Sequence, residues 1–266
     1  MKKGYIALVA LLFCVASASG QTRADGKMAF LKKFGYELGL HTGMDIGAAV
    51  PWPPSNLGSG MKMNAVPHLA PQLGVSGTAR INPRWSLSVE ATYKQLGIDA
   101  KARVDNQKFM DPNKPEDGSD ALKVNFKGTT EISMRFYMLE VPLYAGFSLG
   151  RNDSRIVGGL YYSRIFKGKF EALPLKGAIT RPGEDEIEVV NPGDLETQNF
   201  DSNMDTWDWG FMLGYEWRVI DRVQLGVRYA MGLKDIFRPG AQFLDYDMLH
   251  MRGSVVLSYK LFRFRR

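Results

Sequence analysis

The stretch that decides the fold is Thr206–Lys234, TWDWGFMLGYEWRVIDRVQLGVRYAMGLK. Within it, residues 207–219 and 223–234 alternate between large apolar residues and residues that are small or polar. A tight break at Ile220-Asp221-Arg222 separates the two segments. Alternation with a period of two indicates β-strands, and both segments exceed the usual strand length of about 5–6 residues. The stretch is therefore predicted to form a long antiparallel hairpin.

The two faces of this hairpin predict different surroundings. One face carries Trp207, Trp209, Phe211, Leu213, Tyr215, Trp217 and Val219, then Val223, Leu225, Val227, Tyr229, Met231 and Leu233. The other face carries glycines together with Glu216, Arg218 and Arg228. Within a lipid bilayer only helices and closed barrels satisfy their backbone hydrogen bonds, and transmembrane barrels are apolar outside and polar inside. We therefore expect the apolar face to meet lipid and the polar face to line a small barrel.

The start of the chain has the pattern of a secretory signal peptide. Lys2 and Lys3 precede an apolar run over 6–16, and small residues follow at 17–20. The run is shorter than the roughly 20 apolar residues of a transmembrane helix. Residues 1–20 are therefore predicted to be a signal peptide, cleaved after Ala18 or Gly20. The single cysteine, Cys14, lies inside it, and the bulky residue before Cys14 disfavours a lipoprotein.

The rest of the chain predicts one barrel domain over 34–266, preceded by a short lead over 21–33. The mean hydropathy of −0.20 is compatible with a barrel, because alternating strands contain no long apolar run. Strands are expected at about 34–50, 67–81, 85–100, 129–149, 155–170, 207–219, 223–234 and 248–262. The connections between them are alternately long (51–66, 104–128, 171–205, 238–247) and short. Long external loops and short periplasmic turns are typical of outer membrane barrels. The predicted fold class is all-β, an eight-stranded antiparallel transmembrane up-and-down β-barrel in the outer membrane of a Gram-negative bacterium.

One irregularity is expected inside the strand over 129–149. Its apolar residues have one parity up to Met138 and the opposite parity from Leu139 onward. An extra residue in one strand would produce such a change, so the sequence predicts a β-bulge at this point.

Several segments resemble the PorT-like outer membrane β-barrel family, within the OmpX/OmpA-type group of eight-stranded barrels. They are FGYELGL (34–40), YMLEVPL (137–143), GGLYY (158–162), DWGF (208–211) and GVRY (226–229). The resemblance covers about 34–262 and implies an outer membrane location. Because the member that names the family is implicated in protein secretion, it also implies an accessory role in a secretion system as one alternative.

The inward-facing charged residues predict a polar plug. They are Glu37, Arg80, Glu90, Lys94, Arg135, Glu140, Glu216, Arg218 and Arg228. An eight-stranded barrel is only wide enough to be filled by side chains, and buried charges must be paired. A structural network of salt bridges is therefore expected, and a proton or ion pathway is the alternative. The outward aromatic residues are expected to form girdles facing lipid: Trp85, Trp207, Trp209, Tyr215, Trp217, Tyr229 and Tyr259.

Catalytic, cofactor and metal sites are not expected. A lipid-modifying enzyme is an alternative in which His41, inward in mid-strand, converges with His68 and His250 at the outer ends of their strands. No serine lies at a spacing that specifies nucleophilic catalysis. Two histidines at the rim lack the third protein ligand of a zinc site. The acidic segments 111–120 and 184–205 do not match a 12-residue calcium loop.

The expected partners follow from this architecture. Basic residues recur singly along the strands rather than in one patch, which argues against nucleic acid. Outer membrane lipid is the expected surrounding, and envelope or secretion proteins are the expected partners of the long external loops. The sequence thus predicts a non-enzymatic barrel with a structural or binding role.

Overall fold

The computed structural model describes residues 35–53, 62–110, 123–150, 154–180, 187–191, 197–239 and 247–264. The predicted signal peptide and lead lie outside these residues. The described elements are β1 (Gly35–Trp52), β2 (Lys62–Pro67), β3 (Ala70–Arg80), β4 (Trp85–Met110), β5 (Lys123–Ser148), β6 (Arg155–Thr180), β7 (Ile187–Val190), β8 (Gln198–Asn199), the 3-10 turn η2 (Asp201–Asn203), β9 (Trp207–Ile220), β10 (Val223–Asp235) and β11 (Asp247–Phe264). In the described part of the chain, no helix has the length and apolar character that crossing a membrane requires.

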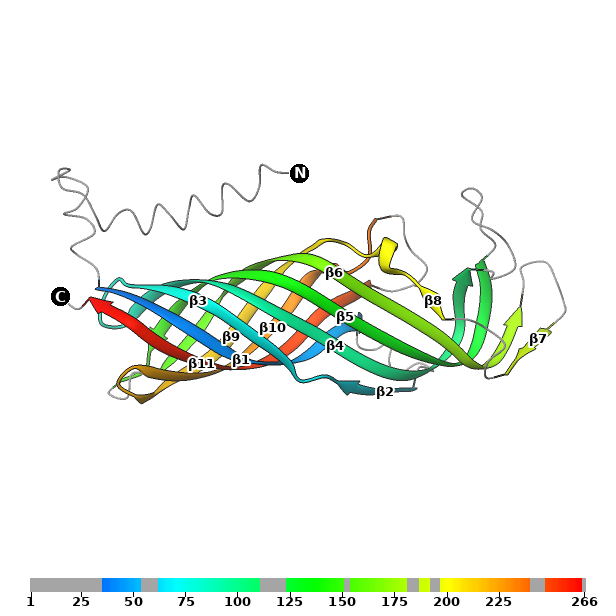
Figure 1. Ribbon diagram of the computed structural model, residues 1–266, viewed down its shortest axis with the longest axis horizontal. Helices are drawn as coiled ribbons and strands as arrows, with labels where there is room; N and C mark the ends of the chain where they lie inside the picture. Colours follow the sequence, from blue (N-terminus) through cyan, green and yellow to red (C-terminus); the bar gives the residue numbers. More distant parts are fainter. Residues whose placement is uncertain are drawn as a thin grey trace.

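Eight of these strands close into an antiparallel barrel (Figure 1). The ring runs β1-β3-β4-β5-β6-β9-β10-β11 and closes by pairing between β11 and β1, for example at Tyr36 and Phe264. Each strand of the ring pairs with its neighbours along the chain, as in an up-and-down barrel. The predicted eight-stranded antiparallel barrel is therefore confirmed, and the hairpin predicted over 207–234 forms β9 and β10, in which Val227 pairs with Tyr215.

The two ends of the barrel differ. At one end, β1 begins, β11 ends and short turns follow β3, β5 and β9 (Figure 1). At the other end, the connections are long, as the sequence predicts. We call the first end the inner end and the second the outer end.

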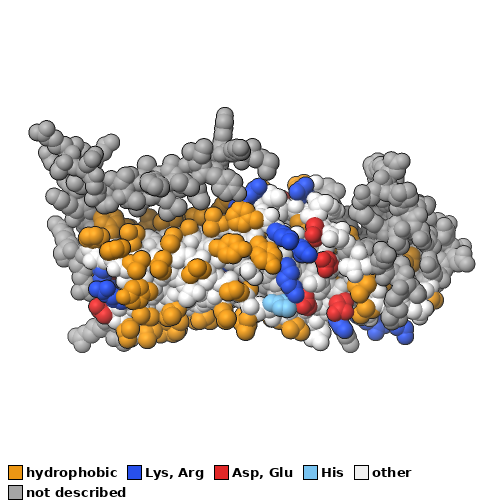
Figure 2. Space-filling model, viewed as in Figure 1, with side chains coloured by type: hydrophobic (Ala, Val, Ile, Leu, Met, Phe, Trp, Pro, Cys, Tyr) orange, Lys and Arg blue, Asp and Glu red, His pale blue; other side chains and the backbone are white. Residues whose placement is uncertain are grey.

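The surface near the inner end is an apolar band. Large apolar side chains project outward from all eight barrel strands, including Leu40, Leu73, Leu87, Leu143, Leu160, Leu213, Val227 and Leu257, each more than two-fifths exposed. In Figure 2 this band covers the half of the visible face toward the inner end. Continuous apolar exposure on this scale is typical of a surface that contacts lipid. We call it the lipid band.

Three neighbouring strands continue far beyond the lipid band. β4, β5 and β6 each contain 26 residues, whereas a tilted strand crosses a bilayer in about 9–11 residues. Their outer parts (95–110, 123–137 and 167–180) stay paired with one another, β2 adds to β4, and β7 and β8 add to β6. We call this extension, visible at the right of Figure 1, the outer sheet.

The outer sheet corrects the predicted loops. The polar loop expected at 104–128 is wrong at both ends, since β4 runs to Met110 and β5 starts at Lys123. The loop expected at 171–205 is also wrong, because β6 continues to Thr180 and the following chain forms β7, β8 and η2. Part of the loop expected at 51–66 is β2. Polar residues face outward in this region, so the segments lack the apolar outward face by which the membrane strands were identified.

The inside of the outer sheet is apolar. Its side chains pack into one buried cluster with residues from the outer ends of the other strands, including Leu96, Ile98, Phe126, Met134, Phe136, Phe170, Phe237 and Met248. Phe170 contacts both Phe200 and Phe237 edge to face, with ring centroids 5.8 and 5.3 Å apart. The core thus holds η2 and the connection after β10 against β6.

The predicted bulge lies on a different strand. β5 keeps one alternation throughout, with Met134, Met138 and Glu140 all buried, and it stays in register with β4 from Thr92 to Val104. The irregularity is on β6, where Ile165 pairs with Met138 and Lys167 pairs with Tyr137, so that Phe166 is the extra residue. Along β5 the apolar parity changes because the apolar face passes from the inside of the outer sheet to the outside of the barrel. The prediction of a bulge within β5 is therefore wrong.

Candidate functional site

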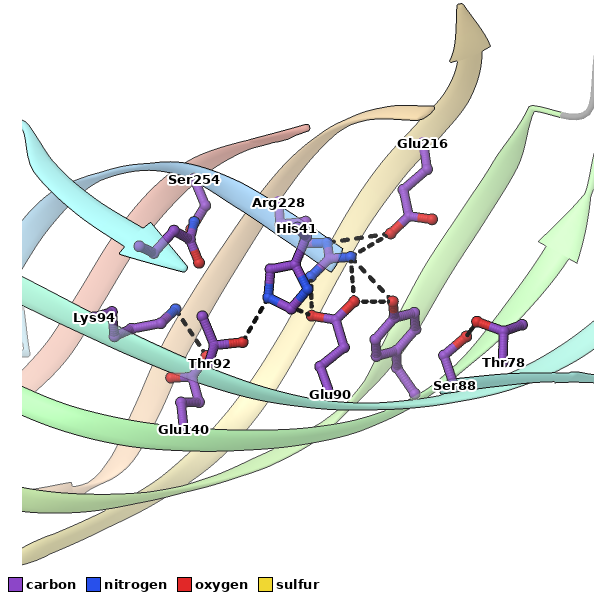
Figure 3. A network of polar contacts seen from close by, with 12 residues as sticks. His41, Thr78, Ser88, Glu90, Thr92, Lys94, Glu140, Glu216, Arg228 and Ser254 are labelled. Atoms are coloured by element: carbon purple, nitrogen blue, oxygen red, sulfur yellow. Dashed lines mark hydrogen bonds and ion pairs between the residues drawn. The ribbon is translucent and has the colours of Figure 1, made fainter. Parts of the chain in front are cut away.

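The centre of the barrel holds a network around Arg228 (Figure 3). Its guanidinium donates to both oxygens of Glu90, at 2.7 and 2.9 Å, and to Glu216 Oε1 at 2.6 Å. The Tyr144 hydroxyl donates to Glu90 Oε1 at 2.5 Å, and Arg155 Nε donates to Glu216 Oε2 at 2.6 Å. All these groups are buried or nearly so, and they come from β4, β5, β6, β9 and β10. The network therefore joins five strands across the lumen.

A second network lies beside it, toward the outer end. Glu140 Oε1 accepts from Lys94 Nζ at 2.9 Å, and Glu140 Oε2 pairs with Arg252. Lys94 Nζ also lies 3.4 Å from Asp45 Oδ2. The side chains of these four residues are at most 7% exposed. Each charge is thus offset by an opposite one, which a buried charge requires.

His41 lies beside the central network. Its Nε2 lies 2.8 Å from Thr92 Oγ1 and 3.8 Å from Glu90 Oε2, and its side chain is fully buried. Space for the ring is provided by Gly74 on the adjacent strand, where a Cβ would lie 2.5 Å from Nε2. The glycine on the polar face of β3 is therefore a packing requirement of the histidine.

At the inner end the interior closes on Glu37. Its carboxylate lies within 3.0 Å of nitrogen atoms of Arg80, Lys260 and Arg263. Arg218 is half-buried nearby and lines a cavity with Arg80 and Lys260. The two cavities found in this region have volumes of about 20 Å³ each, enough for a water molecule or two. In the described part of the barrel the lumen is therefore filled by side chains.

Most of the predicted interior residues lie where parity places them, and Arg135 does not. Glu37, Glu90, Lys94, Glu140, Glu216 and Arg228 are buried inside, and Arg80 and Arg218 lie at the inner end. Arg135 projects from the outer face of the outer sheet, so its assignment to the interior is wrong. Its strand has one inward parity, shared by Met134 and Glu140, and Arg135 has the other.

Arg135 belongs to a polar group on the outer surface. It donates to both oxygens of Asp99, at 2.9 and 3.1 Å, while His68 Nε2 lies 2.7 Å from Asp99 Oδ2 and Ser133 donates to Oδ1 at 2.9 Å. The hydrogen bonds from Arg135 hold the pKa of the Asp99 carboxyl well below its usual range. The group joins the connection before β3 to β4 and β5, just beyond the lipid band.

The three histidines lie in separate environments rather than converging. His41 is in the central network, His68 is on the outer surface, and His250 is buried against Phe136 with the ring centroids 4.6 Å apart. The serine near His68, Ser133, donates to Asp99 and not to the imidazole. The convergence considered for an enzyme is therefore wrong.

Two carboxylates of the acidic segment 184–205 have side-chain contacts within the described residues. Asp201 Oδ1 accepts from the Phe170 backbone nitrogen at 2.9 Å, and Asp205 pairs with Lys234. The other acidic segment, 111–120, lies outside the described residues.

The interior networks also include residues that the predicted plug did not contain: Asp45, Tyr144, Arg155, Tyr161, Asp208 and Arg252. Tyr161 donates to Asp208 Oδ2 at 2.8 Å and lies under the Arg252 guanidinium, 4.4 Å from its ring centroid. Parity alone would have found Tyr144 and Asp208, which share the inward phase of Glu140 and Glu216. The weak alternation of β6 concealed Arg155 and Tyr161.

The predicted girdle residues all project outward. Six are 37–47% exposed, and Trp217 is half-buried against Tyr215. Trp207 and Trp209 lie at the outer end of β9, Trp217 near its inner end, and Trp85 and Tyr259 near the inner end of their strands. Tyr229 is in the middle of β10, opposite Leu213, so it does not stand at either edge of the lipid band.

A family model agrees with this architecture. The family model of an outer membrane protein β-barrel domain matches residues 32–238. A search of curated proteins finds no match.

Among solved structures, the chain is similar to Ail, the attachment invasion locus protein of Yersinia pestis, in complex with the heparin analogue sucrose octasulfate (9% identity, 86% of this chain and 99% of that chain covered, TM-score 0.38). It is also similar to Neisserial surface protein A (13% identity, 85% and 97% covered, TM-score 0.36) and to the outer membrane protease OmpT from Escherichia coli (12% identity, 86% and 96% covered, TM-score 0.34). On the family match, this chain belongs to the outer membrane protein β-barrel domain family and lies in the outer membrane of a Gram-negative bacterium.

Proposed function

We propose that this protein is a non-enzymatic outer membrane barrel whose outer sheet holds a binding surface outside the cell. The observation that carries the proposal is the length of β4, β5 and β6, which continue beyond the lipid band as a paired sheet with its own apolar core. Binding residues are often carried on loops that a rigid scaffold positions. The apolar core makes the outer sheet a scaffold of this kind.

The filled lumen supports a function at the outer surface rather than transport through the barrel. Ion pairs between opposite walls fill the lumen. A path for solutes through the barrel would require these pairs to break, and breaking a buried ion pair costs free energy because it leaves a charge unpaired. A passive channel is therefore disfavoured, and the outer sheet is the surface that remains available to a partner.

The PorT resemblance supports a finer alternative, an accessory component of a secretion system that docks through the same sheet. A filled lumen is compatible with such a role, because an accessory component acts through its surface. This alternative predicts stable co-purification with envelope proteins and loss of secreted cargo when the gene is deleted.

Site-specific photo-crosslinking in intact cells would test the proposal. The crosslinker replaces Lys101, Thr129 or Glu131, which project from the outer face of the outer sheet. The matched control places it at Leu143, which lies in the lipid band on the same strand as Thr129 and Glu131. We expect a discrete protein or glycan adduct from the outer-sheet positions and none from Leu143. An envelope protein in the adduct would favour the secretion alternative. The absence of adducts at all three positions, or a change in lipid mass that depends on the protein, would contradict the proposal.

A further inference from the structure

The lipid band ends at a group of cations on β6. Arg164, Lys167 and Lys169 lie within six consecutive residues of β6, next to the outermost aromatic residues of the band. Arg164 is opposite Trp207 in the pairing of β6 with β9, and Trp207 stacks on Tyr162 with ring centroids 6.2 Å apart. Figure 2 shows Lys and Arg side chains, with Asp and Glu side chains beside them, where the apolar surface ends on the visible face.

The bulge on β6 creates this arrangement. Before it, odd-numbered residues such as Ile165 face inward, and after it even-numbered residues such as Phe170 do. As a result, Phe166 and Lys167 are successive residues and are both exposed on the outside. A bulge re-aims side chains in this way. Here it places an apolar side chain and a charged one side by side at the boundary between the lipid band and water.

The cations of this group are incompletely neutralised by the protein. Within the described residues, Arg164 and Lys167 have no carboxylate within 4.0 Å, and Arg164 donates only to the Thr206 hydroxyl at 3.0 Å. Lys169 has Glu171 at a long 3.7 Å, with both side chains about two-fifths exposed. Arg135, on the neighbouring strand, is by contrast satisfied by Asp99. The charge excess therefore lies on β6.

We propose that Arg164, Lys167 and Lys169 bind the phosphate groups of an outer-leaflet glycolipid. The position matches, because the phosphates of a lipid lie at the level where its acyl chains end. The neighbouring Tyr162, Phe166 and Trp207 offer apolar surface to the acyl chains of the same molecule. Basic residues next to a bilayer surface attract anionic lipid headgroups, and interfacial aromatic rings anchor at the same level. This inference concerns the lipid boundary and stands apart from the partner proposed for the outer sheet.

The test uses the full chain in lipid nanodiscs and a matched pair of triple variants. The test variant is Arg164→Gln, Lys167→Gln, Lys169→Gln. The control variant is Lys101→Gln, Arg103→Gln, Lys176→Gln, which removes the same charge from outward cations farther from the lipid band. Native mass spectrometry then measures retention of diphosphorylated lipid A, of its dephosphorylated form and of a zwitterionic phospholipid. Circular dichroism and heat-modified gel migration show whether each variant is folded.

We expect wild type and the control variant to retain the diphosphorylated lipid equally well. The test variant should bind it on the order of 100-fold more weakly, since each interfacial cation contributes about fivefold. Removing the phosphates from the lipid should lower wild-type binding to the level of the test variant. The proposal would be overturned if both variants lost lipid binding equally, or if wild type bound the phosphorylated and dephosphorylated lipids equally well. Displacement of the lipid by an equal concentration of inorganic phosphate would also overturn it and would assign a free anion instead.

Discussion

The two halves of β4 are built in opposite ways. From Trp85 to Tyr93 the outward residues are large and apolar and the inward ones are Ser86, Ser88, Glu90 and Thr92. From Gln95 to Arg103 the inward residues are Leu96, Ile98, Ala100 and Ala102, and Asp99, Lys101 and Arg103 face outward. The strand does not change its phase between the halves. What changes is the solvent, lipid around the first half and water around the second.

This contrast separates two sources of stability. In water, burial of apolar surface stabilises the outer sheet at about 25 cal/mol per Å². In the lipid band an outward apolar side chain has an apolar surrounding whether or not it packs against protein. The membrane part therefore depends more on its backbone ladder and on paired charges inside, and substitutions at the same parity should have opposite effects in the two halves.

The largest expected effect is from Glu216→Ala. It removes the partner that Arg155 and Arg228 share inside the barrel. Breaking a buried ion pair leaves an uncompensated charge and costs about 3–5 kcal/mol. Urea unfolding in lipid vesicles should show this loss. The control is Glu131→Ala, whose partner Lys101 is 3.9 Å away on the exposed face, and it should cost below about 1 kcal/mol. Equal losses for both variants would remove the distinction between interior and exterior charges.

A smaller effect is expected from Val89→Arg. Val89 is 48% exposed in the middle of the lipid band, and an arginine on the lipid face near the bilayer midplane costs about 2–4 kcal/mol. Two outward residues beyond the band, Lys101 and Arg103, are naturally cationic. Lys101→Leu should therefore leave the stability within about 0.5 kcal/mol of wild type. Vesicle-based unfolding measures both, and a tolerated arginine at position 89 would show that this surface does not face lipid.

The smallest effect is expected from Leu96→Ala. Leu96 is 2% exposed in the apolar core of the outer sheet. Its truncation should cost about 2 kcal/mol, at the low end for a buried leucine because Met134 and Met138 belong to the same cluster and can rearrange. Hydrogen exchange should become faster in the outer sheet and stay unchanged in the lipid band. Leu87→Ala, on the lipid face of the same strand, is the control and should not change exchange in the outer sheet.

Much of the barrel could be predicted because alternation is a local property of the chain. The apolar outward face of 207–219 and 223–234 defines strands, register and solvent without any knowledge of neighbours. The same reasoning placed Glu90, Lys94, Glu140, Glu216 and Arg228 inside. It failed for Arg135, because an apolar-outside rule was extended to a part of the strand that lies in water.

The outer sheet was predicted only in part, for a related reason. The strands were expected to end at about Ala100 and Phe170, and the residues that follow, 101–103 and 171–180, include small or polar residues such as Ala102, Lys176 and Gly177 that are weak strand signals. Their strand structure depends on pairing with one another and on a core that also includes Phe200 and Met204 beside η2, Phe237 after β10 and Met248 of β11. Long-range contacts of that kind are not visible in a local pattern.

The sequence by itself determined that the chain is a membrane barrel of eight strands, because the alternation of apolar and polar residues within each strand shows which face contacts lipid. Only the tertiary structure decided which charges meet inside, that β6 rather than β5 carries the bulge, and that three strands leave the membrane together. The physical reason is the difference in sequence range between these interactions. Solvent acts on every residue separately, whereas an ion pair such as Arg228–Glu90, a bulge and a shared core depend on partners that the chain brings together only when the barrel closes.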